Sequence, residues 1–131
     1  MPASPLAYTD ACLRLPWITP VAAVRAVAAG ATLVDLRSQR EVAATGLATG
    51  ALHIPMAAFE AAATPGHPGF CPALSPARTV ILYCATGVRS QIAGGFLLAR
   101  GHADVWNLGG LREWLDGGGT IRRQPATARS A

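Results

Sequence analysis

Residues 80–90 read VILYCATGVRS, and the rest of the chain is organised around this stretch. The four residues before Cys84 are β-branched, aliphatic or aromatic, which is typical of a buried strand. A loop of small residues follows, and Arg89 and Ser90 can begin a helix. This order predicts that Cys84 lies at the carboxyl end of the strand, where open α/β sheets bind their ligands.

The loop after Cys84 is suited to holding an anion. Where a short loop enters a helix, successive backbone N–H groups converge at the positive end of the helix. A cysteine with a pKa near 8.5 is only about 3% thiolate at pH 7, whereas one lowered to roughly 6.5 is about 75% thiolate. Cys84 could instead be a small apolar core residue, but the small and polar residues that follow it have no packing reason to lie together. We therefore expect a reactive thiol.

The length and composition predict one soluble domain. The chain has 131 residues and is 51% hydrophobic, but no apolar run approaches the length of a membrane span. Residues 1–9 lack a basic region followed by an apolar block, so we expect no secretory signal and a cytoplasmic protein. Three cysteines at irregular spacing do not form a disulfide framework, which agrees with a reducing compartment.

The net charge of +4 comes entirely from arginine, because the chain contains no lysine. Arg122, Arg123 and Arg129 lie near the C-terminus among glycine and proline, where we expect a mobile end. No aromatic residues alternate with them and no predicted helix carries a basic stripe, so neither nucleic acid nor a membrane is expected as a partner. We divide the chain into an N-terminal arm (1–15), one domain (16–118) and a flexible basic tail (119–131).

Predicted strands and helices alternate along the domain. Thr19 and Pro20 are suited to begin a helix that Gly30 ends, and residues 38–41 fit a capping box that opens a second helix. We expect strands at 16–18, 32–36, 52–54, 80–84 and 103–106, and further helices at 56–63, 91–100 and 108–115. Residues 46–51 should form a turn. Residues 64–76 should form a loop that acts as a lid or faces the substrate. In the last helix, Trp114 and Leu115 should pack inward. The alternation predicts an α/β fold, with a parallel central sheet of about five strands and helices on both faces.

Asp35 and Arg37 lie near the carboxyl end of the strand at 32–36, on the sheet edge where we place Cys84. They could be catalytic. A charged pair after a strand is more often an ion-pair and hydrogen-bond clamp that positions loops, and we favour this structural role near the site.

Histidine and the other cysteines do not predict a metal site. His53 is flanked by apolar residues and is interpreted as a hydrogen-bonded structural histidine. His67 and Cys71 have a spacing that a metal could use, but zinc needs three or four ligands and no second local pair exists. Cys12 has no nearby partner and is interpreted as an incidental thiol. We expect no metal and no other cofactor.

Four motifs together resemble the rhodanese family, single-domain type, from about Ile18 to Gly117. They are Asp35-Leu36-Arg37 with Glu41, the stretch 46–55 ending in His53-Ile54-Pro55, the loop from Cys84 to Ser90, and Gly109-Gly110 with Trp114. Each motif alone is weak, but four in the right order and spacing are specific.

The resemblance implies a sulfurtransferase, in which Cys84 takes sulfane sulfur from a small-molecule donor such as thiosulfate. The resulting persulfide passes its sulfur to cyanide, a thiol or a protein acceptor. The residues that would bind the substrate are Ala85, Thr86, Gly87, Val88, Arg89 and Ser90, with their N–H groups around the anion and Arg89 supplying charge at the rim. Thiosulfate-using members often have a basic residue where this chain has Ala85, and many members have histidine where this chain has Leu47.

Two alternatives stay open. The first is a cysteine-dependent phosphatase or arsenate reductase of the same fold, because a nest of N–H groups could also hold a tetrahedral oxyanion. Cysteine phosphatases resemble one another in having five residues between the cysteine and the arginine, whereas four separate Cys84 from Arg89 here. The shorter loop suits a single sulfur atom. The second alternative is a persulfide carrier or redox interaction module.

Overall fold

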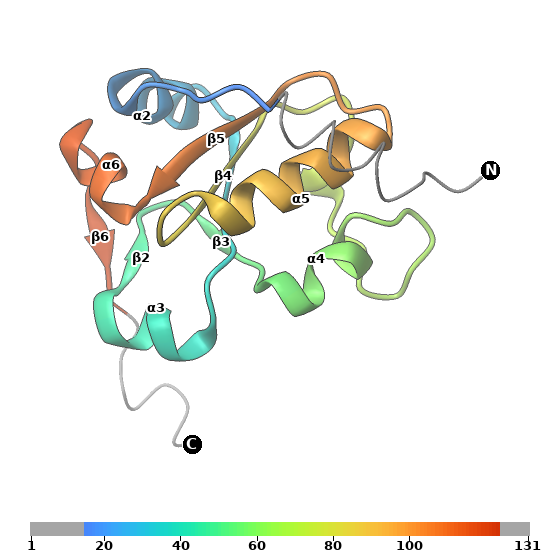
Figure 1. The fold of residues 1–131 in the computed structure, drawn as a ribbon, viewed down its shortest axis with the longest axis horizontal. Helices are drawn as coiled ribbons and strands as arrows, with labels where there is room; N and C mark the ends of the chain where they lie inside the picture. The colour runs from blue at the N-terminus through green and yellow to red at the C-terminus, as the bar shows by residue number, and fades with distance from the viewer. Residues whose placement is uncertain (1–14, 124–131) are drawn as a thin grey trace.

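A computed structural model describes residues 15–123, and its centre is a parallel sheet. The sheet has four strands in the order β3-β1-β4-β5, as Figure 1 shows. Their bounds are Thr32–Asp35 for β1, Leu52–His53 for β3, Val80–Cys84 for β4 and Val105–Gly110 for β5. Every residue of β4 is buried, which explains why this strand is a continuous apolar run and shows no alternation with polar residues.

Helices cover both faces of the sheet, as predicted. The helices are α2 (Pro20–Ala28), α3 (Gln39–Thr45), α4 (Met56–Ala62), α5 (Val88–Ala99) and α6 (Leu111–Asp116), with a 3-10 turn, η1, at Pro72–Leu74. Val80, Leu82 and Cys84 belong to the core under α4 and α5, whereas Ile81 and Tyr83 belong to the core under α2, α3 and α6. Side chains alternate between the two faces of a strand, so Cys84 faces the α5 side.

Two helix starts form as the sequence predicted. The Thr19 hydroxyl accepts the Ala22 N–H at 3.3 Å, with Pro20 as the first residue of α2. At α3, the Ser38 hydroxyl accepts the Glu41 N–H at 3.2 Å and Glu41 Oε1 accepts the Ser38 N–H at 2.9 Å. The capping box is therefore complete, and it holds the Glu41 carboxylate in a defined place.

The sheet is narrower than the five strands we expected. The stretch at 16–18 makes a single parallel bridge, Trp17 to Asn107, at the outer edge of β5. Leu15 is buried and packs against Gly94, so it belongs to the domain and not to the predicted arm. The remainder of the predicted arm, with Cys12, lies outside the described residues.

The predicted turn at 46–51 and the predicted tail both contain a strand. Leu47–Ala48 (β2) pairs antiparallel with Ile121–Arg122 (β6), apart from the main sheet. Two hydrogen bonds of Thr120 hold the segment before β6 in place. The Thr120 carbonyl accepts the Trp114 indole N–H and the Thr120 hydroxyl donates to Thr49, both at 2.8 Å. The prediction of a flexible tail from residue 119 is therefore wrong as far as residue 123.

Two element boundaries and the burial of one side chain also differ from the prediction. α5 begins at Val88 and not at 91, and β5 continues to Gly110 and does not end at 106. Leu115, expected inside, is 45% exposed, while Trp114 is buried. Within residues 15–123, no helix has the length and apolar character needed to cross a membrane.

Asp35 and Arg37 form the clamp that we predicted. Both are buried, and the Arg37 guanidinium donates to Asp35 Oδ2 at 2.8 Å and through Nε to Oδ1 at 3.0 Å. Its remaining N–H groups donate to the Thr45 hydroxyl at 2.6 Å and the Gly46 carbonyl at 2.7 Å. The ion pair thus ties the end of β1 to the end of α3.

Asp35→Asn should destabilise the fold strongly, because the buried Arg37 charge would lose its counter-charge. Breaking one partner of a buried pair costs about 3–5 kcal/mol, and urea unfolding would measure the loss. Glu60→Gln is the control, since Glu60 is exposed on α4. A loss no larger than that of the control would contradict the structural role of the clamp.

Candidate active site

Cys84 ends β4 and is only 1% exposed. Its sulfur accepts the Gly87 N–H at 3.1 Å. Gly87 caps α5 in the left-handed conformation, with φ of 98°, which favours glycine because it has no Cβ. The turn between strand and helix therefore directs an amide back onto the thiol, at the positive end of α5.

Two neighbours hold the Gly87 turn from outside. A Cβ on Gly87 would lie 2.5 Å from the Trp17 indole, so the ring covers the turn closely. Asn107 is completely buried in β5, and its side-chain amide donates to the Gly87 carbonyl at 3.0 Å and to Gln91 Oε1 at 2.8 Å. Sequence reasoning missed Asn107, although a polar residue just before Gly109-Gly110 was a signal that could have been used.

A bulge in β5 brings a glycine against the loop. Asn107 pairs with Leu82, but the next pair is Gly109 with Tyr83, so the strand gains one residue and Gly110 comes opposite Cys84. A Cβ on Gly110 would collide with the Ala85 carbonyl oxygen. The close approach of two backbones thus requires glycine at 110, whereas Gly109 has a positive φ of 99°, which favours glycine.

The surroundings of Cys84 favour its thiolate. Burial raises the pKa of the Cys84 thiol, but the Ser90 hydroxyl and amide and the amides of Gly87 and Thr86 lower it, and the net shift is downward. The Ser90 hydroxyl is fully buried and has no hydrogen-bond partner among residues 15–123. It is therefore free to donate to the sulfur when the sulfur is charged.

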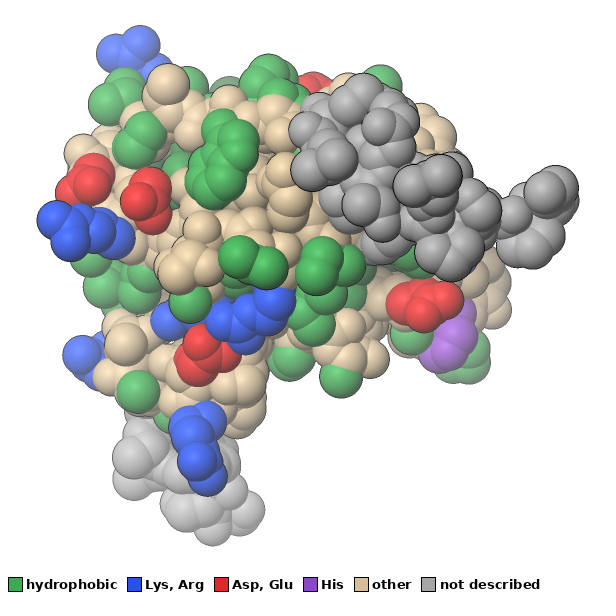
Figure 2. All heavy atoms as spheres, in the orientation of Figure 1, with side chains coloured by type: hydrophobic (Ala, Val, Ile, Leu, Met, Phe, Trp, Pro, Cys, Tyr) green, Lys and Arg blue, Asp and Glu red, His purple; other side chains and the backbone are tan. Residues whose placement is uncertain are grey.

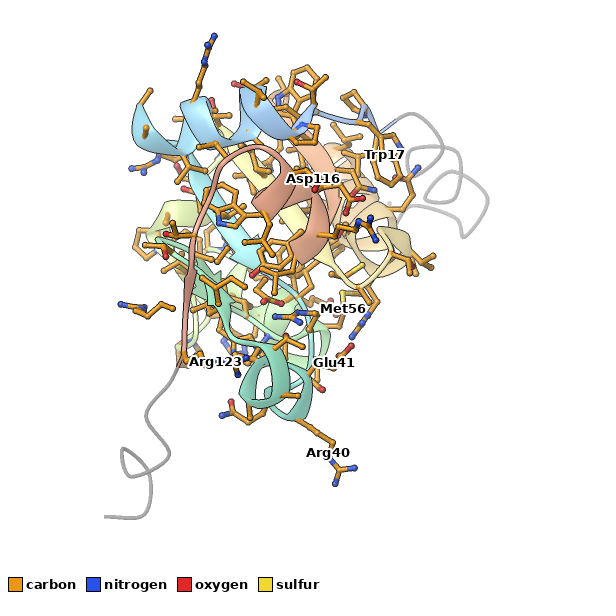
Figure 3. The ribbon with its side chains drawn as sticks, turned by 90° about the vertical axis from the view of Figure 1, so that its left-hand side faces the viewer. Trp17, Arg40, Glu41, Met56, Asp116 and Arg123 are labelled. Carbon is orange, nitrogen blue, oxygen red and sulfur yellow. The ribbon has the colours of Figure 1, made fainter. Side chains whose placement is uncertain are left out.

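Arg89 is paired with Glu41 and does not stand alone at the rim. Its two terminal nitrogens donate to the two carboxylate oxygens at 2.7 and 2.9 Å. Basic and acidic side chains adjoin on this face, between α3 and the start of α5, with hydrophobic side chains beside them (Figure 2). In the side view, Glu41 lies on the same side of the molecule as Trp17 and Met56 (Figure 3). We expected Arg89 to supply charge at the rim; the structure shows that its guanidinium is paired with Glu41 and also interacts with Cys84, and both interactions raise the pKa of Arg89.

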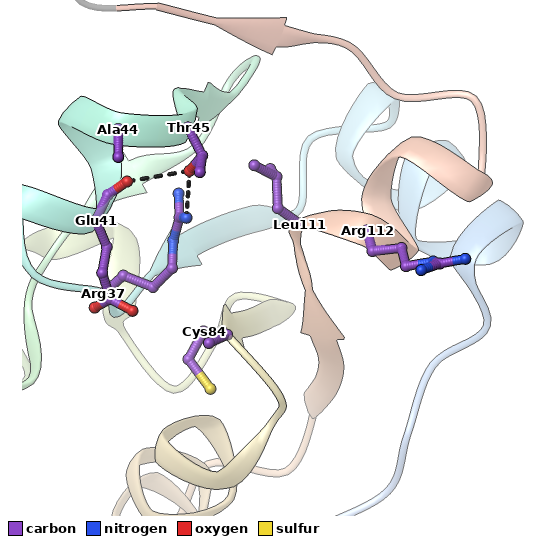
Figure 4. A pocket seen from close by; sticks show the side chains of 8 residues that line it. Arg37, Glu41, Ala44, Thr45, Cys84, Leu111 and Arg112 are labelled. Carbon is purple, nitrogen blue, oxygen red and sulfur yellow. Dashed lines mark hydrogen bonds between the residues drawn. The ribbon is translucent and has the colours of Figure 1, made fainter.

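A cavity of about 350 Å³ opens beside the thiol, as Figure 4 shows. Its lining residues are Arg37, Glu41, Ala44, Thr45, Cys84, Ala85, Leu111 and Arg112. Of the predicted site residues, Cys84 and Ala85 line it, with Arg37 on the opposite wall and Asp35 behind Arg37. Of the remaining loop residues, Gly87 donates its N–H to the sulfur, and Ser90 and Thr86 lower the pKa of the thiol.

Several wall residues were missed by sequence reasoning. Ala44, Thr45 and Leu111 carry no distinctive chemistry, and only the packing of α3 and α6 against the loop brings them to the cavity. Conversely, the predicted lid at 64–76 supplies none of the lining residues. Instead, Leu74 in this segment is fully buried in the core beneath α4 and α5.

The histidines have structural contacts. His53 Nε2 donates to the Arg37 carbonyl at 2.7 Å, which confirms the predicted structural role. His102 Nε2 donates to the Leu74 carbonyl at 2.6 Å. In the described part of the chain, no three His, Cys, Asp or Glu side chains gather as a metal site requires.

Gly110→Ala should displace the loop, because its methyl group would overlap the Ala85 backbone. A misplacement of about 1 Å at a reactive centre can cost up to roughly 100-fold in rate, so we expect alkylation of Cys84 to slow by about 10- to 100-fold. Gly69→Ala is the control, because the nearest atom to its Cβ lies at 3.4 Å. Equal alkylation rates in the two variants would refute the requirement for glycine.

Ser90→Ala should raise the pKa of the Cys84 thiol, because it removes a group that lowers it. The midpoint of alkylation rate against pH should then move to higher pH, since the thiolate is the reacting form. Ser75→Ala, at the end of η1, serves as the control. A midpoint that does not move would show that the hydroxyl has no effect on the thiolate.

The chain is similar to proteins of one family. The rhodanese-like domain model matches residues 19–116. Among solved structures, a possible tyrosine phosphatase from Rhodopseudomonas palustris is 27% identical, with a TM-score of 0.75 and coverage of 93% of this chain and 99% of that one. The human single-domain sulfurtransferase TSTD1 is 30% identical, with a TM-score of 0.61 and coverage of 77% and 96%. A polysulfide-sulfur transferase from Wolinella succinogenes is 23% identical, with a TM-score of 0.68 and coverage of 91% and 86%, and shows the fold.

No curated protein matches the chain. The match to the family model nonetheless spans most of the sequence and contains the clamp, the cysteine loop and the glycine pair. The parallel sheet flanked by helices is also the fold of these neighbours. The chain therefore belongs to the rhodanese-like domain family.

Proposed function

We propose that the protein is a sulfurtransferase that carries sulfane sulfur as a persulfide on Cys84. The observation that carries the proposal is the thiol itself, which accepts the Gly87 N–H at 3.1 Å at the start of α5 and borders a cavity. A thiol whose pKa is lowered in this way is more often present as the thiolate, the form that acts as a nucleophile. The proposed partners are a small-molecule sulfur donor and a thiol acceptor.

The reaction needs two displacements at sulfur. The Cys84 thiolate attacks the outer sulfur of the donor, a new S–S bond forms, and the donor's own bond to that sulfur breaks with its electron pair leaving on the donor. An acceptor thiolate or cyanide then attacks the outer sulfur of the persulfide, and Cys84 departs as the thiolate. The amides of Val88, Arg89 and Ser90 lie in the first turn of α5, where no helix carbonyl precedes them. They are suited to bear the negative charge of the persulfide.

The loop length favours sulfur transfer over phosphate chemistry. Four residues separate Cys84 from Arg89, and the two terminal nitrogens of Arg89 already bind the Glu41 carboxylate. The similarity to the human sulfurtransferase supports the same choice. The similarity to a possible tyrosine phosphatase makes phosphate hydrolysis the alternative to be tested.

Intact mass of the purified protein tests the proposal. Incubation with a sulfane donor should add the mass of one sulfur atom to the Cys84 peptide, and cyanide should remove it. Cys84→Ser should gain no sulfur, because a serine hydroxyl cannot form a persulfide. Cys71→Ser and Cys12→Ser are the matched controls and should load like the wild type.

Three outcomes would contradict the proposal. If Cys71→Ser abolished turnover, the mechanism in which Cys84 acts alone would give way to one in which Cys71 is a resolving cysteine. Loading without release to any thiol or cyanide would favour a persulfide carrier. Hydrolysis of aryl phosphates faster than transfer from any sulfane donor would favour the phosphatase.

A further inference from the structure

One cation on the wall of the cavity has no counter-charge. Arg112 lines the cavity from α6, and its side chain is exposed. Within residues 15–123 it makes no hydrogen bond and no ion pair. Its acidic neighbour Glu113 is occupied elsewhere, because Glu113 Oε1 accepts the Gly110 N–H at 2.9 Å. The guanidinium of Arg112 is therefore free to bind an anionic group of a ligand.

The other two arginines near the sulfur already have partners. Arg37 is held in the buried clamp at the end of β1. Arg89 is paired with Glu41 and also interacts with Cys84, so its charge serves the reacting sulfur. Arg112 lies on the α6 side of the cavity, with its guanidinium directed away from the sulfur (Figure 4). Its charge therefore suits a group that is remote from the reacting atom of the ligand.

The strand pairing limits how far Arg112 lies from the sulfur. Gly110 of β5 pairs with Cys84 of β4, and neighbouring strands lie about 4.8 Å apart. Arg112 follows two residues after Gly110, and two residues span at most about 7 Å. The Cα atoms of Arg112 and Cys84 are therefore within about 12 Å of each other. A small molecule with several bonds between its sulfur and its anionic group can reach both.

The wall between these two positions can hold a carbon chain. Ala44, Ala85 and Leu111 are the apolar members of the lining, and the cavity of about 350 Å³ has the size of a small-molecule site. In thiosulfate the sulfonate is bonded directly to the transferred sulfur, so it would lie near the loop and not at Arg112. The remote cation is instead suited to an organic molecule with a charged end.

The second displacement uses more of this cavity than the first. Once Cys84 carries an extra sulfur, its reactive end projects farther by one S–S bond, about 2 Å. The acceptor must therefore attack from farther out in the cavity, on the side where Arg112 lies. This geometry favours Arg112 as a contact of the acceptor.

We propose that Arg112 is a specificity-determining residue that binds the sulfur acceptor, and that the acceptor is a small aliphatic thiol with a terminal carboxylate. The inference rests on the sulfur transfer proposed above. The acceptor thiolate R–S⁻ attacks the outer sulfur of Cys84–S–SH and forms R–S–SH. The S–S bond of the Cys84 persulfide breaks and Cys84 leaves as the thiolate with the electron pair, so atoms and charge balance without an oxidant. Arg112 holds the carboxylate of R and takes no part in the bond changes.

Two acceptors that differ only at the far end test the role of Arg112. They are 6-mercaptohexanoate and 6-mercaptohexanol, whose thiols are on the same six-carbon chain. With a saturating sulfane donor, the ratio of kcat/KM for the carboxylate to that for the alcohol should fall by about two- to fivefold in Arg112→Gln, the effect of one exposed ion pair. The change should lie in KM and not in kcat, because Arg112 does not touch the reacting sulfurs.

Matched variants separate this contact from a general effect of charge. Arg112→Lys keeps the charge and should keep most of the preference for the carboxylate. Arg40→Gln removes one positive charge from an exposed side chain of α3 that is directed away from the body of the protein (Figure 3), and it should leave the ratio unchanged. An equal fall in Arg112→Gln and Arg40→Gln would overturn the inference, and so would no fall in either.

Wild-type protein supplies two measurements that do not depend on a variant. Added salt should lower the ratio of carboxylate to alcohol, because an exposed ion pair is screened. In the shorter pair, mercaptoacetate and 2-mercaptoethanol, the ratio should not depend on salt in this way, because the carboxylate cannot reach Arg112 while the sulfur is at Cys84. A ratio for the six-carbon pair that does not change with salt would contradict the ion pair.

Failure of the inference can be told apart from failure of the proposed function. If Cys84 takes up no sulfur from any sulfane donor, sulfur transfer itself is overturned. Sodium hexanoate has no thiol and tests Arg112 without sulfur transfer, because a chain bound between Arg112 and Cys84 should slow alkylation of the thiol. Protection should be weaker in Arg112→Gln than in wild type. Equal protection in the two proteins would overturn the role of Arg112 alone.

Discussion

The hydrogen bond from the Gly87 amide to the Cys84 sulfur is the contact on which the rest of the site depends. It forms only because Gly87 turns left-handed between β4 and α5, a conformation that side chains with a Cβ disfavour. Trp17 covers the turn and Asn107 binds its carbonyl. A buried thiol is ordinarily less acidic; here the Ser90 hydroxyl and amide, followed by the Gly87 and Thr86 amides, lower the pKa of Cys84 and reverse the effect of burial.

Two ion pairs lie beside the Cys84 sulfur. The Asp35–Arg37 pair is buried and ties β1 to α3. The Glu41–Arg89 pair is partly exposed and joins the first turns of α3 and α5. The amides at the start of α5 add positive potential near the sulfur, beside the Arg89 guanidinium, whose pKa is raised by Glu41 and also by Cys84. Such a source is suited to a small, singly charged group, because its N–H donors converge on one atom and are not spread around a large anion.

Contacts across the fold account for most errors of sequence-based prediction. The tail at 121–122 forms β6 because Trp114 and Thr120 return it to β2, and two-residue strands carry too little periodicity to be seen in a sequence. Arg89 and Glu41 are 48 positions apart, so no local pattern could show that they neutralise each other. The bulge in β5 that sets Gly110 against the loop likewise depends on how the residues of β5 pair with those of β4, which no local pattern shows.

The sequence by itself determined the α/β class, the strand that ends at Cys84, the helix caps, the Asp35–Arg37 clamp and the short loop that leads from Cys84 into α5. These features depend on neighbouring residues, whose periodicity, capping side chains and glycines act within one or two turns of chain. Only the tertiary structure decided the four-strand order, the β2–β6 pair, the Asn107 support and the walls of the cavity. Those features depend on which distant segments meet, and that choice is made by the packing of whole elements.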